Sequence, residues 1–105
     1  MSKFQLVSAE KLKEMLEQRN FWSRIQSNKL LAKEQARKPA KMADGGTSYI
    51  ISYYDEHLQY VCTIHKVEDR KGSIVHEHVK DAYIDGIHYR AQAKDPKNSS
   101  GISQP

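Results

Sequence analysis

The Asp85-Gly86 pair constrains the fold of this chain more than any other feature. β-Forming residues flank the pair, and both of its residues tolerate the positive φ angles of a type I′ turn between two strands. A two-residue turn fixes the register of the hairpin, and with it the side chains that share each face. The predicted cross-strand pairs are Ile84–Ile87, Tyr83–His88, Ala82–Tyr89 and Asp81–Arg90. One face is then apolar, and the other carries Tyr, His, Asp and Arg side chains together.

The chain changes its hydrophobic period near Thr47. From this point apolar and polar residues alternate, as is typical of half-buried strands, and turn signals interrupt the alternation at residues 55–58 and 68–72. Residues 93–105 are rich in Lys, Pro, Asn, Ser and Gly, and we expect a disordered tail there. The pattern predicts a four-stranded antiparallel β-meander with strands at 48–54, 59–67, 73–84 and 87–92.

The sequence before the sheet has helical periodicity over residues 8–38. Ser8 is a suitable N-cap, and Pro39 ends any helix that precedes it. A straight helix from 9 to 38 would be about 45 Å long, so we expect a break near Asn20 or at Ser27-Asn28. Residues 39–47 form a predicted linker. The fold class is therefore α+β, a single small domain over residues 1–92. A helix or helix pair packs on one face of the sheet through Leu12, Met15, Leu16, Trp22 and Ile25.

The pairing of the inner strands decides which face each polar residue occupies. We expect Ile64 to pair with His76, which leaves Glu77 on the polar face. The preceding turn is five residues long, and a slip of one residue would exchange His76 and His78 with Glu77. The first hairpin is predicted to pair Tyr49–Ile64, Ile51–Cys62 and Tyr53–Tyr60.

Composition sets further bounds on the class of protein. The chain has 105 residues, of which 38% are hydrophobic, so it has enough length for one core. It has no apolar run of the roughly 20 residues that span a bilayer, and its N-terminus lacks the apolar stretch of a signal peptide. The single cysteine, Cys62, cannot form an internal disulfide, which fits a reducing compartment. We therefore expect a cytoplasmic protein without a membrane partner.

Positive charge is concentrated in the N-terminal part of the chain. Residues 1–41 hold ten Lys or Arg and four Asp or Glu, whereas residues 42–105 hold seven and nine. Lys29, Lys33 and Arg37 recur every four positions and predict one basic stripe on a helix. Such a stripe can line the phosphates of RNA or another nucleic acid. The alternative is a solvated helix face beyond the end of the core.

The predicted polar face also holds the residue types that RNA cleavage needs. One group must take the 2′-hydroxyl proton, another must protonate the leaving oxygen, and a cation must stabilise the phosphorane. Histidine titrates near neutral pH and can act as either base or acid. In this hypothesis Glu77 is an alternative base, Arg90 the phosphate clamp, and Tyr83 an orienting or proton-donating group. The candidate catalytic residues are His65, Glu77, Tyr83, His88 and Arg90. The alternative is an ordinary solvated surface on which Asp81 pairs with Arg90.

His76-Glu77-His78 indicates a metal site when it is taken together with Cys62. Structural zinc sites need four ligands, and this spacing matches no standard pattern. The two histidines can instead lie at the rim of the apolar face. We therefore expect neither a metal nor another cofactor.

The order of elements, helices followed by an antiparallel sheet over residues 8–92, resembles the architecture of microbial ribonucleases and RelE-type toxins. The resemblance implies catalytic residues that project from one sheet face, and Glu77, His88 and Arg90 fit by residue type. We expect a small RNA-targeting protein, with a metal-independent endoribonuclease of the toxin type as the specific hypothesis. The alternative is a non-enzymatic interaction module, such as a small inhibitor, an antitoxin-like partner or an adaptor, which docks a protein through its sheet by means of exposed aromatics such as Tyr54 and Tyr83.

Overall fold

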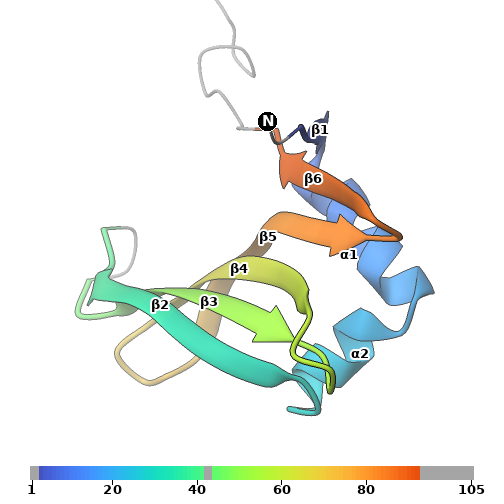
Figure 1. The fold of residues 1–105 in the computed structure, drawn as a ribbon. Coiled ribbons are helices and arrows are strands. Elements are labelled where there is room, and N and C mark those ends of the chain that lie inside the picture. Colours follow the sequence, from blue (N-terminus) through green and yellow to red (C-terminus); the bar gives the residue numbers. More distant parts are fainter. Residues whose placement is uncertain (1–2, 42–43, 93–105) are drawn as a thin grey trace, which may run out of the picture.

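The protein forms a six-stranded mixed sheet with two short helices packed against it (Figure 1). The structure is a computed structural model that describes residues 3–41 and 44–92. The elements are β1 (Gln5–Val7), α1 (Ala9–Gln18), α2 (Phe21–Gln26), β2 (Leu31–Pro39), β3 (Thr47–Tyr54), β4 (Tyr60–Glu68), β5 (Ile74–Ile84) and β6 (Ile87–Ala91). The strand order is β1-β6-β5-β4-β3-β2. The α+β class predicted from the sequence is confirmed. The predicted tail over 93–105 lies outside the described residues.

The β5–β6 hairpin forms around the Asp85-Gly86 turn as predicted. Asp85 and Gly86 have φ angles of 53° and 80°, as both positions of a type I′ turn require. All four predicted cross-strand pairs are present, from Ile84–Ile87 to Asp81–Arg90. The predicted strands correspond to β3, β4, β5 and β6, and each pairs antiparallel with the next.

The prediction of a four-stranded antiparallel sheet is wrong at both edges. β1 pairs with β6 in parallel, and β2 pairs antiparallel with β3. A strand as short as β1 has too few residues to show alternation. Residues 31–38, predicted to be helical, form β2 together with Pro39, the first residue of the predicted linker, and all nine residues are exposed. Their Lys, Glu, Gln and Ala residues favour helix, but intrinsic propensity is a weak prior that pairing with β3 overrides.

The predicted basic helix stripe does not form. Lys29 precedes β2, and the register places Lys33 opposite Ser52 but Arg37 opposite Tyr49. An irregularity between Glu34 and Ala36 adds a residue to the strand, so Lys33 and Arg37 lie on opposite faces of the sheet.

α1 packs on one side of the sheet beside β5 and β6, and α2 packs against α1 (Figure 1). The Ser8 hydroxyl caps α1 by accepting a hydrogen bond from the Lys11 N–H at 3.0 Å. The predicted break lies at Asn20, which has a φ of 63° between the helices. None of the helices in the described ranges is long and apolar enough to cross a membrane. As predicted, Leu12, Met15, Leu16, Trp22 and Ile25 pack in the core, against Val61, Cys62, Ile64, Val79, Ala82 and Ile84.

The predicted register between β4 and β5 is wrong, and the difference changes which charged and histidine side chains lie on the polar face. Ile64 pairs with Val79 rather than with His76, and between Thr63 and Ile64 the partner changes from Asp81 to Val79. Lys80 is therefore an extra residue, a β-bulge. The bulge reverses the faces of residues 76–79, and a second irregularity between Val67 and Glu68 restores the predicted facing at Ile74.

The bulge moves His76 and His78 onto the polar face and Glu77 off it. Glu77 pairs with Lys66 on the other face, and His65 pairs with His78. The first hairpin is displaced by two residues from its predicted register, so that Tyr53 rather than Ile51 pairs with Cys62. A shift of two leaves the facing of Ile51, Tyr53 and Cys62 unchanged. The predicted pair Tyr53–Tyr60 is wrong, because an irregularity between Tyr53 and Tyr54 pairs Tyr60 with Tyr54 and places it on the polar face.

Candidate functional site

The candidate site lies on the sheet face opposite the helices, called here the polar face. Its buried hydroxyls are satisfied within the sheet, since Ser48 Oγ lies 2.8 Å from His65 Nε2 and Ser52 Oγ lies 2.8 Å from Thr63 Oγ1. The register places on this face Ser48, Ser52, Thr63, His65, His76, His78, Asp81, Tyr83, His88 and Arg90.

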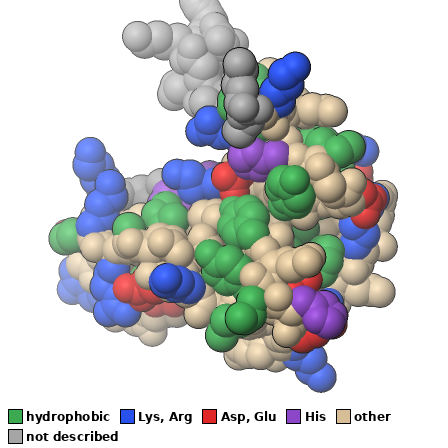
Figure 2. All heavy atoms as spheres, in the orientation of Figure 1, with side chains coloured by type: hydrophobic (Ala, Val, Ile, Leu, Met, Phe, Trp, Pro, Cys, Tyr) green, Lys and Arg blue, Asp and Glu red, His purple; other side chains and the backbone are tan. Residues whose placement is uncertain are grey.

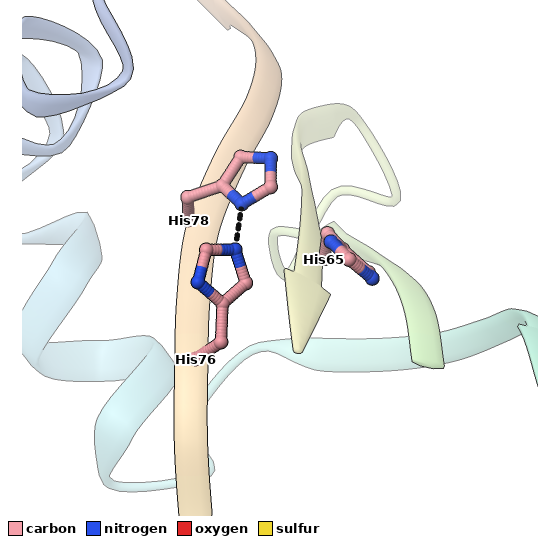
Figure 3. A group of neighbouring side chains, drawn as sticks. All are labelled: His65, His76 and His78. Atoms are coloured by element: carbon pink, nitrogen blue, oxygen red, sulfur yellow. Dashed lines mark hydrogen bonds between the residues drawn. The ribbon is translucent and has the colours of Figure 1, made fainter. Parts of the chain in front are cut away.

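Three histidines on the polar face form the histidine cluster: His65 from β4 with His76 and His78 from β5 (Figure 3). His76 Nε2 lies 2.7 Å from His78 Nδ1. The ring centroid of His65 lies 5.5 Å from that of His76 and 5.2 Å from that of His78. Alternation within β5 aligns His76 with His78, and direct pairing across the strands adds His65.

Burial keeps part of the histidine cluster neutral. It lowers the pKa of His65 and lowers the pKa of His78 to about 4. Positive charge at His76 and Lys80 depresses both pKa values further. At neutral pH the imidazoles of His65 and His78 therefore each retain an unprotonated nitrogen that can accept a proton or bind a metal ion.

The histidine cluster borders a groove of about 750 Å³ that also includes the start of α1. Lys80 and Arg90 lie along this groove, and Glu10 acts on His78 by raising its pKa. Lys38, opposite Ser48 in the register, lowers the pKa of His65 and so lies close to the cluster. The groove is therefore bordered by the cations Lys80 and Arg90 and by the carboxylates of Glu10 and Glu77.

A second group of residues, the His88 cluster, surrounds His88 on β6. His88 Nε2 lies 3.5 Å from Asp81 Oδ2, and the Tyr83 and Phe4 rings lie 6.2 and 6.0 Å from the His88 ring. The Arg90 guanidinium lies over the Phe4 ring, 4.8 Å from its centroid. A hollow of about 480 Å³ lined by Phe4, Tyr83 and His88 adjoins these residues. A base, a hydroxyl and a cation thus share one end of the polar face.

The structure divides the predicted catalytic residues. Tyr83, His88 and Arg90 lie together in the His88 cluster, whereas His65 belongs to the histidine cluster. Glu77 borders the groove from a strand position that faces the other side. Glu77 also raises the pKa of the Tyr53 hydroxyl on that side, after the larger effect of burial.

Asp81 and Arg90 are cross-strand neighbours, but each side chain has other partners. The Tyr60 hydroxyl donates a hydrogen bond to Asp81, which also faces His88, while Arg90 stacks on Phe4. The Arg90 guanidinium is thus held by a ring and not by the predicted carboxylate. Phe4 was not among the predicted site residues, because a single aromatic residue before a three-residue strand gives no periodic signal.

Cys62 lies apart from His76 and His78, with which the sequence indicated a metal site. It is fully buried in the core on the helix side, and burial raises the pKa of its thiol to about 12. The cluster around His76 and His78 instead contains His65, which Ser48 contacts. The sequence did not indicate that these residues lie together. The alternation in His76-Glu77-His78 indicated that the two histidines share one face of the strand. Which face of the sheet they occupy depends on the Lys80 bulge, which the sequence does not reveal.

Figure 2 shows Lys and Arg side chains gathered at the end of the molecule where β2 ends, with hydrophobic side chains over the middle of this view. Within β2, Lys33 and Lys38 pair with Ser52 and Ser48, and therefore share the polar face. No protein-family model, curated protein or solved structure matches this chain.

Proposed function

We propose that this protein binds RNA on its polar face and cleaves it as a metal-independent endoribonuclease at the His88 cluster. The observation that supports this function is the grouping of Tyr83, His88 and Arg90 at one end of that face. These side chains supply the base, the proton donor and the cation that RNA cleavage needs, so the proposed reaction requires no metal ion. The proposal keeps three of the predicted catalytic residues and leaves out His65 and Glu77, which lie apart from the others.

The reaction follows from the chemistry of the three groups. His88 takes the proton of a 2′-hydroxyl, whose oxygen attacks the adjacent phosphorus, and the bond to the 5′-oxygen breaks. Tyr83 donates a proton to the departing oxygen. Arg90 stabilises the negative charge of the phosphorane. The Asp81 carboxylate, 3.5 Å from His88 Nε2, orients the imidazole so that its Nδ1 can act as the base.

RNA binding depends on the cations that share the polar face. Lys33, Lys38 and Lys80 extend positive charge from the His88 end towards the edge strand. Phe4 offers an aromatic ring on which a base can stack. Binding of this kind weakens steeply with salt because each phosphate contact releases counterions.

Cleavage of a fluorescently labelled single-stranded RNA, in buffer containing EDTA, tests the reaction. We expect His88→Ala to lower the cleavage rate by about 10²- to 10⁴-fold, because a general base is lost. Arg90→Ala should lower it by about 10²- to 10³-fold. His57→Ala is the matched control, since His57 is an exposed histidine in the β3–β4 turn. Cleavage by His88→Ala at the wild-type rate would refute the proposal.

RNA binding can be tested with a pair of neighbouring residues. Lys38→Glu should weaken binding at low salt, whereas Arg37→Glu, one residue away on the opposite face, should have a smaller effect. Equal losses in the two variants would show that binding does not use the polar face.

A protein-interaction module is the second candidate, and the edge strand β2 favours it. All nine residues of β2 are exposed, and a strand at the edge of a sheet offers unpaired backbone groups to a partner strand. Tyr83 is also exposed, whereas Tyr54 is half-buried against Tyr60. A stoichiometric protein partner that protects β2 amides from hydrogen exchange, together with absent RNA cleavage, would favour this function.

A further inference from the structure

We propose that His65, His76 and His78 bind a zinc ion and leave its fourth coordination position open to the groove. The site goes beyond the proposed ribonuclease function, and none of its three ligands is one of the residues that carry out the proposed cleavage. Two ligands come from alternate positions of β5, and the third is the direct cross-strand neighbour of one of them. This arrangement brings three imidazoles together from rigid strand positions (Figure 3).

The distances between the ring nitrogens fit such a site after small side-chain rotations. One nitrogen of each ring lies within 4.8 Å of those of the other two. Zinc with Zn–N bonds of about 2.0–2.1 Å in tetrahedral geometry needs nitrogens about 3.4 Å apart. The longest separation must therefore shorten by somewhat more than about 1 Å, while His76 Nε2 and His78 Nδ1, now 2.7 Å apart, must separate slightly.

Hydrogen bonds around the cluster assign the ligand atoms. His65 Nε2 lies 2.8 Å from Ser48 Oγ, and with Nε2 engaged there, Nδ1 is free to bind the metal. The proton shared between His76 and His78 moves to the other nitrogen of its own ring when zinc binds. Ser48 thus orients a ligand in the way that outer partners of zinc-bound histidines commonly do.

The composition of the site indicates the metal and its fourth ligand. Three imidazoles without a thiolate form the kind of ligand set that holds zinc with one exchangeable position. Lys38 and Lys80 lie close to the cluster, and Arg90 lies along the groove. These positive charges weaken cation binding, but they strengthen the binding of an anion to the metal. The exchangeable ligand is therefore water or a small anion.

The test uses the full chain without an affinity tag and zinc chloride as the probe. Calorimetry should give one zinc ion per chain. In NMR spectra of the imidazole nitrogens, the signals of His65, His76 and His78 should shift on zinc addition, whereas those of His57 and His88 should not. Because this measurement needs no variant, it decides the matter even if a substitution prevents folding. Zinc-induced shifts confined to His57 or His88 would overturn the proposal.

Variants test the individual zinc ligands, and substitution of Co²⁺ for zinc tests the open coordination position. His78→Ala should lower zinc affinity by about 100-fold or more, and Ser48→Ala by about 10-fold. His57→Ala should bind zinc like the wild type. Bound Co²⁺ should show the intense visible absorption of a four-coordinate ion, and this absorption should change when azide is added. Unchanged zinc affinity in His78→Ala would overturn the site, and a cobalt spectrum insensitive to azide would overturn its open position. Neither result depends on whether the protein cleaves RNA.

Discussion

At the scale of single residues, Tyr60 holds the middle of the polar face together. Its hydroxyl donates a hydrogen bond to Asp81 and lies 2.5 Å from Thr63 Oγ1, which in turn contacts Ser52. Burial and the Asp81 carboxylate raise the pKa of the Tyr60 hydroxyl, so it remains a neutral donor. The chain of contacts links β3, β4 and β5 and ends on the Asp81 carboxylate, which lies 3.5 Å from His88 Nε2.

Tyr60→Phe should lower the free energy of unfolding by about 1–3 kcal/mol, because Asp81 and Thr63 lose a partner in a half-buried place. Urea denaturation measures this change. Tyr54→Phe is the control, since it keeps a ring against Tyr60 at 5.8 Å and leaves the Asp81 contact in place. Equal stability of Tyr60→Phe and the wild type would show that the Tyr60 hydroxyl contributes nothing to the face.

At the scale of elements, a bidentate contact joins the end of α1 to the β5–β6 turn. Arg19 Nε and Nη2 both donate to Asp85 Oδ2, at 3.1 and 2.5 Å. The hydrogen bonds from Arg19 hold the pKa of Asp85 below its usual range. Since the folded state lowers this pKa, the contact stabilises the protein above the unfolded pKa of about 3.9 and is lost as the pH falls through the lower folded value.

Asp85→Asn should therefore be less stable than the wild type at pH 7, and the difference should shrink as the pH falls below the unfolded pKa of about 3.9 and through the lower folded value. Asn tolerates the positive φ of 53° at this position, so the turn itself is preserved. Urea midpoints at several pH values measure the effect. The stability difference should also shrink in 1 M salt, because both side chains are partly exposed. A difference that persists unchanged to low pH would assign the effect to the turn and not to the charge.

The β5–β6 hairpin could be predicted from the sequence, whereas the Lys80 bulge and the pairing of β2 could not. Asp85-Gly86 and the alternation around it specify local geometry, so the hairpin and the faces of Tyr83, His88 and Arg90 were predictable. The Lys80 bulge was not, because an inserted residue leaves no mark in composition or turn chemistry. The histidine cluster depends on that one residue, and the pairing of β2 depends on a partner strand rather than on its own sequence.

At the scale of the whole molecule, stability should fall from the centre of the sheet to its edges. β4 lies between β3 and β5, and β5 pairs with β4 and, over residues 81–84, with β6. The two strands carry the buried core residues Ile64 and Val79, which the helices help to cover. β2 lies at one edge, with all nine residues exposed and with β3 as its one neighbour in the sheet. Local opening requires less free energy where few apolar contacts must break.

Native-state hydrogen exchange should therefore find the slowest amides in β4 and β5, with free energies of opening close to that of global unfolding. The β2 amides that bond to β3 should exchange much faster, and the β2 amides that point away from β3 should be nearly unprotected. The matched comparison within one sheet is β3, which pairs with β4 on its other side. If the outward amides of β2 were as protected as those of β4, another chain would have to cover this edge in solution. Protection that fades on dilution would identify that chain as a second copy of the protein.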